Sequence, residues 1–396
     1  MNWKFLIAIS LGLLIIGLGH AGALSSPDSK PAPSLPPHKE KPSPTPPRIG
    51  GGIVVKTFTG SSSIAQAKSF LNQYWGKLTL RLNLNEFQNV TFVGIALRPL
   101  PSGAYAPLYY FGRVGECPAD LLKRAFYTEL SAFENIPLEV KGSLADEPGR
   151  NWKYIGAVRS IRTSREIRVT TSIWTEEKAT VYNEFGAEFW VTYGTSGQYV
   201  YYAYLSHEGK VPTKASGNLK VAVKNVTESV KVLNSKDAFI GVGSFRPEGS
   251  GSTSHSTVTW GLNVGFGVDS TGRPLPNAQA GFTESHSTAL SFKWYTDDVD
   301  PNSEVHFNFY DLEERGFIFS HPAWGKIFIA HPAVVVHVDP GVTFHLAKLK
   351  LKAEALFHYG AVIDSPFSGT YITRHDVEAP PIEFTVEMYP WFINEP

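Results

Sequence analysis

The sequence predicts a mainly β protein, in which an antiparallel β-sandwich-like body follows a small N-terminal α+β unit. Three observations lead to this fold class. Apolar residues three and four apart, the spacing of a helix, occur only in residues 63–74 and 118–135. From about residue 151 onward, short β-branched and aromatic runs alternate with Gly, Pro and Asn turns. The roughly 350 residues after the first fifty provide enough apolar material for a large core.

The first fifty residues predict export and a spacer. A basic start is followed by an apolar run over residues 5–18 and by Ala21, Gly22 and Ala23, whose small side chains suit a signal peptidase. Residues 1–23 are therefore interpreted as a signal peptide, with an uncleaved membrane anchor as the alternative. Residues 24–49 are rich in Pro, Ser and Lys, a composition typical of a disordered linker. We expect the protein to be secreted or to lie on the extracellular face of the cell envelope.

Residues 50–148 predict the small α+β domain. The second helical stretch begins with Pro118 and has Asp120 in its first turn, both favourable at a helix start. We expect the two helices to cover one face of a small sheet. The strands expected between and after the helices are residues 78–84, 90–96, 106–111 and, beyond residue 148, 152–158.

Residues 149–396 predict the antiparallel β-sandwich domain. No convincing helical spacing occurs there, and residues 348–355 alternate Lys or Glu with Leu or Ala, as in a strand with one wet and one dry face. The expected strands are residues 167–174, 187–193, 198–205, 219–223, 238–245, 305–310, 327–330, 334–338, 342–346 and 382–386.

Composition narrows the classes of partner. The chain carries 36 positive and 36 negative side chains, and only 18% of its residues are charged. A nucleic-acid-binding domain needs a basic footprint, so nucleic acid is not expected as a partner.

Two further features fit an exported chain. Cys117 is the only cysteine, so no intrachain disulfide can form. Asn89 and Asn225 each begin an Asn-x-Thr triplet, which makes them candidate glycosylation sites.

The most distinctive segment of the folded body is residues 250–294. A Ser/Gly/Thr/His run leads into strict alternation over residues 258–268, where Thr, Gly and Asn occupy one parity and apolar residues the other. After a Gly/Pro-rich connection, residues 278–294 return with a similar alternation, which predicts a long amphipathic hairpin. The residues proposed to make contacts through its apolar parity are Val258, Trp260, Leu262, Val264, Phe266, Val268, Phe282, Phe292 and Trp294.

In pattern, this segment resembles the stem hairpins of β-pore-forming toxins. Eleven alternating residues match the roughly 9–11 that a tilted transmembrane strand needs. The likeness covers only this segment, comes with no diagnostic motif, and is interrupted by Glu284 and His286 on the apolar parity. A long sandwich hairpin that packs against a neighbouring chain is the alternative interpretation.

A partial calcium-loop pattern follows the hairpin. Asp298, Asp300, Asn302 and Glu304 place oxygen ligands at alternating positions, as Ca²⁺ sites require. Ser303 stands where a helical calcium loop has glycine, which excludes that loop type. An irregular Ca²⁺ site or a simple turn between strands remain the two interpretations.

No catalytic motif is present, so no catalytic residue is predicted and an enzyme is the less favoured class. Glu184 and Glu188 lie beside aromatic residues, as a glycosidase pair might, but on one strand they would be about 13 Å apart, beyond the ~5–9.5 Å that this reaction uses. The sequence thus favours a non-enzymatic surface protein that contacts itself or other envelope proteins. A membrane-inserting or pore-forming protein and a secreted hydrolase are the alternatives.

Overall fold

The computed structural model confirms a mainly β protein with an α+β start. It describes residues 52–390 except 88, 114–117, 145–146, 173–174, 194–198, 212–218, 234–239, 248–249, 254–256, 264–265, 269–273, 277–280, 287–289, 301–302, 316–319, 323, 339–345, 366–368 and 373–374. The predicted signal peptide, the predicted linker and Cys117 lie outside this part of the chain. No helix among the described residues is long and apolar enough to cross a membrane.

Twelve strands form the first sheet. They are β1 (Val54–Thr59), β3 (Phe92–Pro99), β4 (Tyr105–Gly112), β5 (Glu139–Leu144), β6 (Glu147–Ser172), β7 (Thr175–Tyr193), β8 (Tyr199–Lys210), β10 (Ile240–Arg246), β12 (Thr257–Asn263), β15 (Gly281–His286), β19 (Phe328–His331) and β20 (Ala333–Val338). The main path runs β1-β3-β4-β6-β7-β8-β19-β12-β15, while β5 pairs with β6, and β20 pairs with both β8 and β10.

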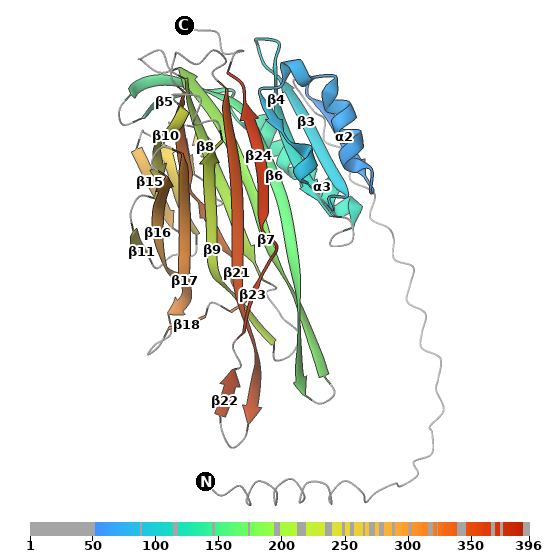
Figure 1. Ribbon diagram of the computed structural model, residues 1–396, viewed down its shortest axis with the longest axis vertical. Helices are drawn as coiled ribbons and strands as arrows, with labels where there is room; N and C mark the ends of the chain where they lie inside the picture. Colours follow the sequence, from blue (N-terminus) through green and yellow to red (C-terminus); the bar gives the residue numbers. More distant parts are fainter. Residues whose placement is uncertain are drawn as a thin grey trace, which may run out of the picture. The chain divides into compact units, whose positions relative to one another are not determined.

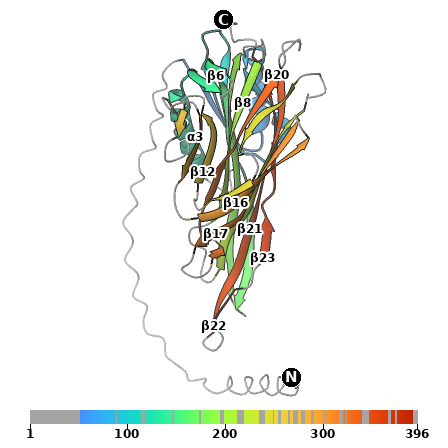
Figure 2. The ribbon, with the colours of Figure 1, turned by 90° about the vertical axis from the view of Figure 1, so that its left-hand side faces the viewer.

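Ten strands form the second sheet. They are β2 (Leu80–Leu82), β9 (Leu219–Val232), β11 (Ser250–Thr253), β16 (Leu290–Asp300), β17 (Glu304–Arg315), β18 (Ser320–Pro322), β21 (Ala347–Ser365), β22 (Gly369–Ile372), β23 (His375–Glu378) and β24 (Ile382–Met388). The path runs β11-β16-β17-β9-β21-β24-β2, and β21 extends past β9 to pair with β22 (Figures 1 and 2). A separate pair joins β13 (Phe266–Val268) to β14 (Pro274–Pro276).

The main core lies between the two sheets. In β21, the buried residues Leu349, Leu351 and Ala353 alternate with the half-buried Lys348, Lys350 and Lys352, as the sequence predicts. Core residues of β7 and β8 meet those of β9, β17, β21 and β24 in one apolar cluster. The body is therefore a sandwich with a mainly apolar core between the sheets and the lysine row of β21 on the outer side.

Several strands are longer than the sequence predicts. β6 runs over 26 residues and contains both predicted strands, 152–158 and the described part of 167–174. Its ladder with β7 has register shifts between Tyr154 and Gly156 and between Val158 and Ile161. These irregularities break the period-two pattern, so that one long strand looks like two short ones in the sequence.

Both predicted helices are present, as α2 (Ser63–Asn72) and α3 (Ala119–Asn135), beside β3 and β4 (Figure 1). The expectation that they share a sheet face is wrong. Phe70 of α2 packs into the main core, whereas Phe126 of α3 packs into a second cluster with Phe92 and Tyr110. β3 is buried almost continuously rather than alternately, and a strand of that kind needs cover on both faces. Gly94 provides the room, because a Cβ there would lie 2.5 Å from the Phe126 ring.

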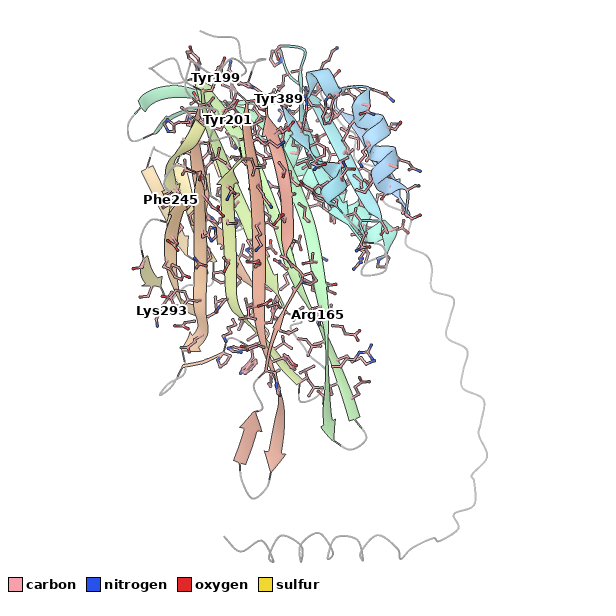
Figure 3. All side chains as sticks on the ribbon, in the orientation of Figure 1. Arg165, Tyr199, Tyr201, Phe245, Lys293 and Tyr389 are labelled. Atoms are coloured by element: carbon pink, nitrogen blue, oxygen red, sulfur yellow. The ribbon has the colours of Figure 1, made fainter. Side chains whose placement is uncertain are left out.

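The sheet continues across residue 148, the predicted domain boundary. Leu108 of β4 pairs in parallel with Ala157 of β6, and Tyr109 donates a hydrogen bond to the Leu80 carbonyl at 2.9 Å. Tyr201 likewise donates to the Met388 carbonyl at 3.4 Å and joins the two sheets. Figure 3 shows Tyr199, Tyr201 and Tyr389 near one end of the long strands and Arg165 and Lys293 toward the other.

Candidate functional site

Residues 250–295 fold back on themselves as three nested antiparallel ladders. Ser250 of β11 lies opposite Tyr295 of β16, Val258 of β12 opposite His286 of β15, and Phe266 of β13 opposite Pro276 of β14. As the residue number rises along the first arm, the number of its partner on the second arm falls, as in a hairpin. The described backbone therefore forms the predicted hairpin. We call residues 250–295 the insertion hairpin from here on.

The register brings positions of the same character together. Leu262 lies opposite Phe282, and Gly261 lies opposite Thr283. Directly opposite residues in an antiparallel ladder belong to the same face, so the register groups the small and polar positions of both arms together and places Leu262 with Phe282 on the other parity. Glu284 and His286, the exceptions, lie opposite Trp260 and Val258 at the end of the β12·β15 ladder that is farthest from the tip.

The predicted contact residues occupy different parts of the insertion hairpin. Phe292 and Trp294 lie in β16, opposite Thr253 and Gly251, and belong to the base ladder in the ten-stranded sheet. Val264 lies outside the described residues. The remaining ones, Val258, Trp260, Leu262, Phe266, Val268 and Phe282, lie in the middle and tip ladders.

The middle of the insertion hairpin is joined to the body by a short ladder. β12 pairs in parallel with β19 through three residue pairs, the first of which is Thr257 with Ile329. The neighbouring ladder between β7 and β8 has twelve pairs. Pairing strength grows with the number of paired residues, and parallel pairs are slightly the weaker kind, so this attachment is far easier to break.

The calcium prediction receives no support from the described residues. Asp298 and Asp300 lie near the end of β16, Glu304 begins β17, and Asn302 lies outside the described residues. Glu304 accepts hydrogen bonds from Lys231 at 2.5 Å and His306 at 2.9 Å. In the part of the chain that the structure describes, no group of three His, Cys, Asp or Glu side chains could hold a metal ion.

The two candidate glycosylation sites differ in accessibility. Asn89 is exposed in a turn with φ of 63°, whereas Asn225 is half-buried in the middle of β9. Asn89 is therefore the more accessible acceptor, and glycosylation of either residue stays a prediction.

The glutamates that were weighed as a hydrolase pair are engaged in ion pairs. Glu184 accepts from Arg162 Nε at 3.0 Å and from Lys210 at 2.7 Å, and Glu188 pairs with Arg159. Burial alone would raise the pKa of Glu184, but Lys210 and Arg162 outweigh burial and lower it. A carboxylate held ionised in this way is a poor general acid.

A buried polar cluster that the sequence does not reveal lies between the two sheets. It joins Asn183 of β7, His207 of β8 and Glu228 of β9, and all three side chains are fully buried. His207 Nε2 lies 2.6 Å from Asn183 Oδ1, and Nδ1 lies 3.6 Å from Glu228 Oε1. We call this cluster the inter-sheet cluster.

Hydrogen bonding determines which ring nitrogen of His207 carries its proton. Asn183 Nδ2 donates to the Ala353 carbonyl at 3.0 Å, so Asn183 Oδ1 is left to accept from His207 Nε2–H. His207 Nδ1 then faces Glu228 without a proton. Among the described residues, neither carboxyl oxygen of Glu228 has a hydrogen-bond partner.

Burial keeps both titratable groups of the inter-sheet cluster neutral. It lowers the pKa of His207 from 6.5 to about 3, and it raises the pKa of Glu228 well above 4.5. Both groups therefore favour their uncharged forms in the folded protein, because a charge there would be desolvated.

Comparisons with known proteins add little. No protein-family model and no curated protein matches the chain. A solved structure titled "Pore forming protein" aligns with 63% of this chain and 96% of its own, at 11% sequence identity and a TM-score of 0.28. A likeness at that TM-score carries no argument about fold or function.

Proposed function

We propose that this protein inserts the hairpin of residues 250–295 into a lipid bilayer and assembles with copies of itself into a pore. The observation that carries this function is the register of the β12·β15 ladder, in which the small and polar positions of the two arms coincide and Leu262 lies opposite Phe282 toward the tip. A strand pair of this kind suits a boundary between lipid and water.

The dimensions of the hairpin agree with this function. Residues 258–268 provide eleven alternating positions on one arm, close to the roughly 9–11 residues that a tilted transmembrane strand needs. Glu284 and His286 lie toward the base of the hairpin, where polar side chains would meet the bilayer surface rather than its centre. The short β12·β19 ladder supports release of the middle and tip of the hairpin at little cost in lost pairing, while β16 at the base stays paired to β17.

Self-assembly follows from the same geometry. An isolated hairpin in hydrocarbon would leave backbone N–H and C=O groups unpaired along both outer edges, each at a cost of several kcal/mol. Hairpins from other copies would satisfy those groups, so insertion and assembly are coupled. This proposal joins the function that the sequence favours, contact between copies, with membrane insertion, which is an alternative interpretation of the sequence.

A disulfide across the β12·β19 ladder tests the release of the hairpin. With Cys117 replaced by Ser, Thr257→Cys and Ile329→Cys place two thiols at directly paired positions. We expect the oxidised variant to lose dye leakage from liposomes and the reduced variant to regain it.

The matched control links the two arms of the hairpin to each other instead of to the body. Ser252 and Lys293 are paired, exposed positions in the base ladder, and a disulfide there adds no link between the hairpin and β19. Leakage should survive oxidation of Ser252→Cys with Lys293→Cys. Equal leakage from the oxidised and reduced forms of the Thr257–Ile329 variant would overturn the proposal.

A further inference from the structure

The inter-sheet cluster lies beside a close approach of the two sheets. Gly209 follows His207 two residues later on the same face of β8, and a Cβ on Gly209 would lie 2.9 Å from Val223 of β9. The His207 ring also meets the Phe185 ring edge-on, with centroids 5.8 Å apart. Any separation of β8 from β9 would therefore bring water to His207 and Glu228.

The strands packed against this pair bring no other charge to it. The core-facing positions nearest the cluster are Asn183 and Phe185 on β7, Gly209 on β8, Ala330 on β19, Val226 and Val230 on β9, Phe307 on β17, and Ala353 on β21. None of these residues is titratable. The charged neighbours Glu184, Glu208 and Lys210 pair with one another at alternate positions of β7 and β8, which place them on the opposite face of the sheet. Among the described residues, His207 and Glu228 are thus the titratable groups at this point of the core.

Each member of the cluster is connected to one arm of the insertion hairpin. His207 pairs with Ala330 of β19, and Ala330 pairs with Val258 of β12. On the other sheet, Glu228 pairs with Phe307 of β17, and Phe307 pairs with Thr296 of β16. The middle ladder of the hairpin is therefore paired to β19, the neighbour of β8, and β16 at its base is paired to β17, the neighbour of β9.

We propose that His207 and Glu228 form a proton-linked latch between the two sheets, which must exchange a proton with solvent when the sheets separate. This inference rests on the proposed function for its consequence, the release of the hairpin, but the latch itself is a property of the soluble protein. Opening ionises Glu228 at neutral or alkaline pH and protonates His207 at acid pH.

The direction of the pH dependence differs for the two groups. The pKa of Glu228 is raised in the closed state, so the latch weakens as pH rises above 4.5, until it reaches the closed-state pKa. The pKa of His207 is lowered in the closed state, so the latch weakens as pH falls from 6.5 toward about 3. Above pH 4.5 and below pH 6.5 the two slopes have opposite signs, so the effects of the two groups oppose each other there.

Neutral substitutions separate the two slopes. Glu228→Gln removes the group that must stay protonated in the closed state. The unfolding equilibrium constant of this variant, divided by that of the wild type, should therefore fall about tenfold for each pH unit above 4.5. His207→Gln should show the corresponding tenfold change for each pH unit below 6.5. Denaturant unfolding of the full chain, followed by tryptophan fluorescence between pH 3 and 9, measures both.

The control is Glu383→Gln, which removes an exposed carboxylate 2.6 Å from Lys350. The stability difference between this variant and the wild type should not change with pH above 6.5.

A flat difference for Glu228→Gln above pH 6.5 would overturn the latch. Should the variants fail to fold, infrared spectroscopy of the wild type decides the matter, because a protonated carboxyl must persist at pH 7 and its absence overturns the latch.

Liposome leakage measured on the same samples distinguishes failure of the latch from failure of the pore proposal. If the protein causes leakage but the stability difference between Glu228→Gln and the wild type does not change with pH, the pore proposal stands and the latch fails. If that difference changes with pH but no leakage occurs at any pH, the latch stands and the pore proposal fails.

Discussion

The sandwich interior and the insertion hairpin are built from the same antiparallel pairing, yet they are held in place differently. In the interior, β7 pairs with β8 over twelve positions, and residues such as Phe185 and Phe384 are buried on the inner faces. The hairpin has alternating faces of its own and meets β19 through three pairs. Burial of side chains fixes the first region, whereas backbone pairing at an edge fixes the second. A change should therefore affect stability in the interior and function in the hairpin.

The largest effect on stability is expected from Phe384→Ala. Phe384 is fully buried and lies with its ring centroid 5.9 Å from Phe87 and 5.8 Å from Phe185. The cavity left behind should lower the free energy of unfolding by about 3–5 kcal/mol. Denaturant unfolding measures this loss, and a loss below about 1 kcal/mol would mean that the two sheets do not depend on this contact.

A smaller loss is expected from Gly209→Ala. The added Cβ would lie 2.9 Å from Val223, so β8 and β9 would have to move apart, at a cost of about 1–3 kcal/mol. Gly76→Ala is the matched control, because Gly76 is exposed and has no atom within 4 Å of such a Cβ. Equal stability of the two variants would contradict the close approach of the sheets.

The smallest effect on stability, and the largest on leakage, is expected from Leu262→Ser. Leu262 lies in the β12·β15 ladder at the edge of the sheet, where a substitution should change the free energy of unfolding by less than about 1 kcal/mol. A polar residue on the apolar parity should nevertheless abolish dye leakage, because that face would meet lipid.

Asn263→Ser provides the comparison for Leu262→Ser. It introduces the same residue one position along the same strand, on the small polar parity, and should leave leakage unchanged. If both variants leak equally, the two faces of the hairpin are equivalent and the proposed function fails.

The features that the sequence predicted well are those that repeat over short distances. The helical spacing located α2 and α3, and the alternation of lysines with Leu349 and Leu351 located the outer and inner faces of β21. The hairpin was also visible, because each arm carries its own period of two. All of these signals depend on residues that are close neighbours in the chain.

Features that depend on distant residues were not predictable in this way. Asn183, His207 and Glu228 are ordinary polar residues in three separate strands, and no local pattern marks them as partners. The placement of α2 and α3 on opposite faces was missed for a related reason, although the unbroken burial of β3 is a local signal that could have corrected it.

The sequence by itself determined the fold class, the positions of the helices and the two-faced character of the insertion hairpin, since period and composition act residue by residue along the chain. Only the tertiary structure decided that the base ladder and the middle ladder of that hairpin join different sheets and that His207 meets Glu228 between those sheets. Contacts of this kind arise from the pairing order of strands far apart in sequence, and the desolvation that makes the pair neutral exists only once the two sheets have closed over it.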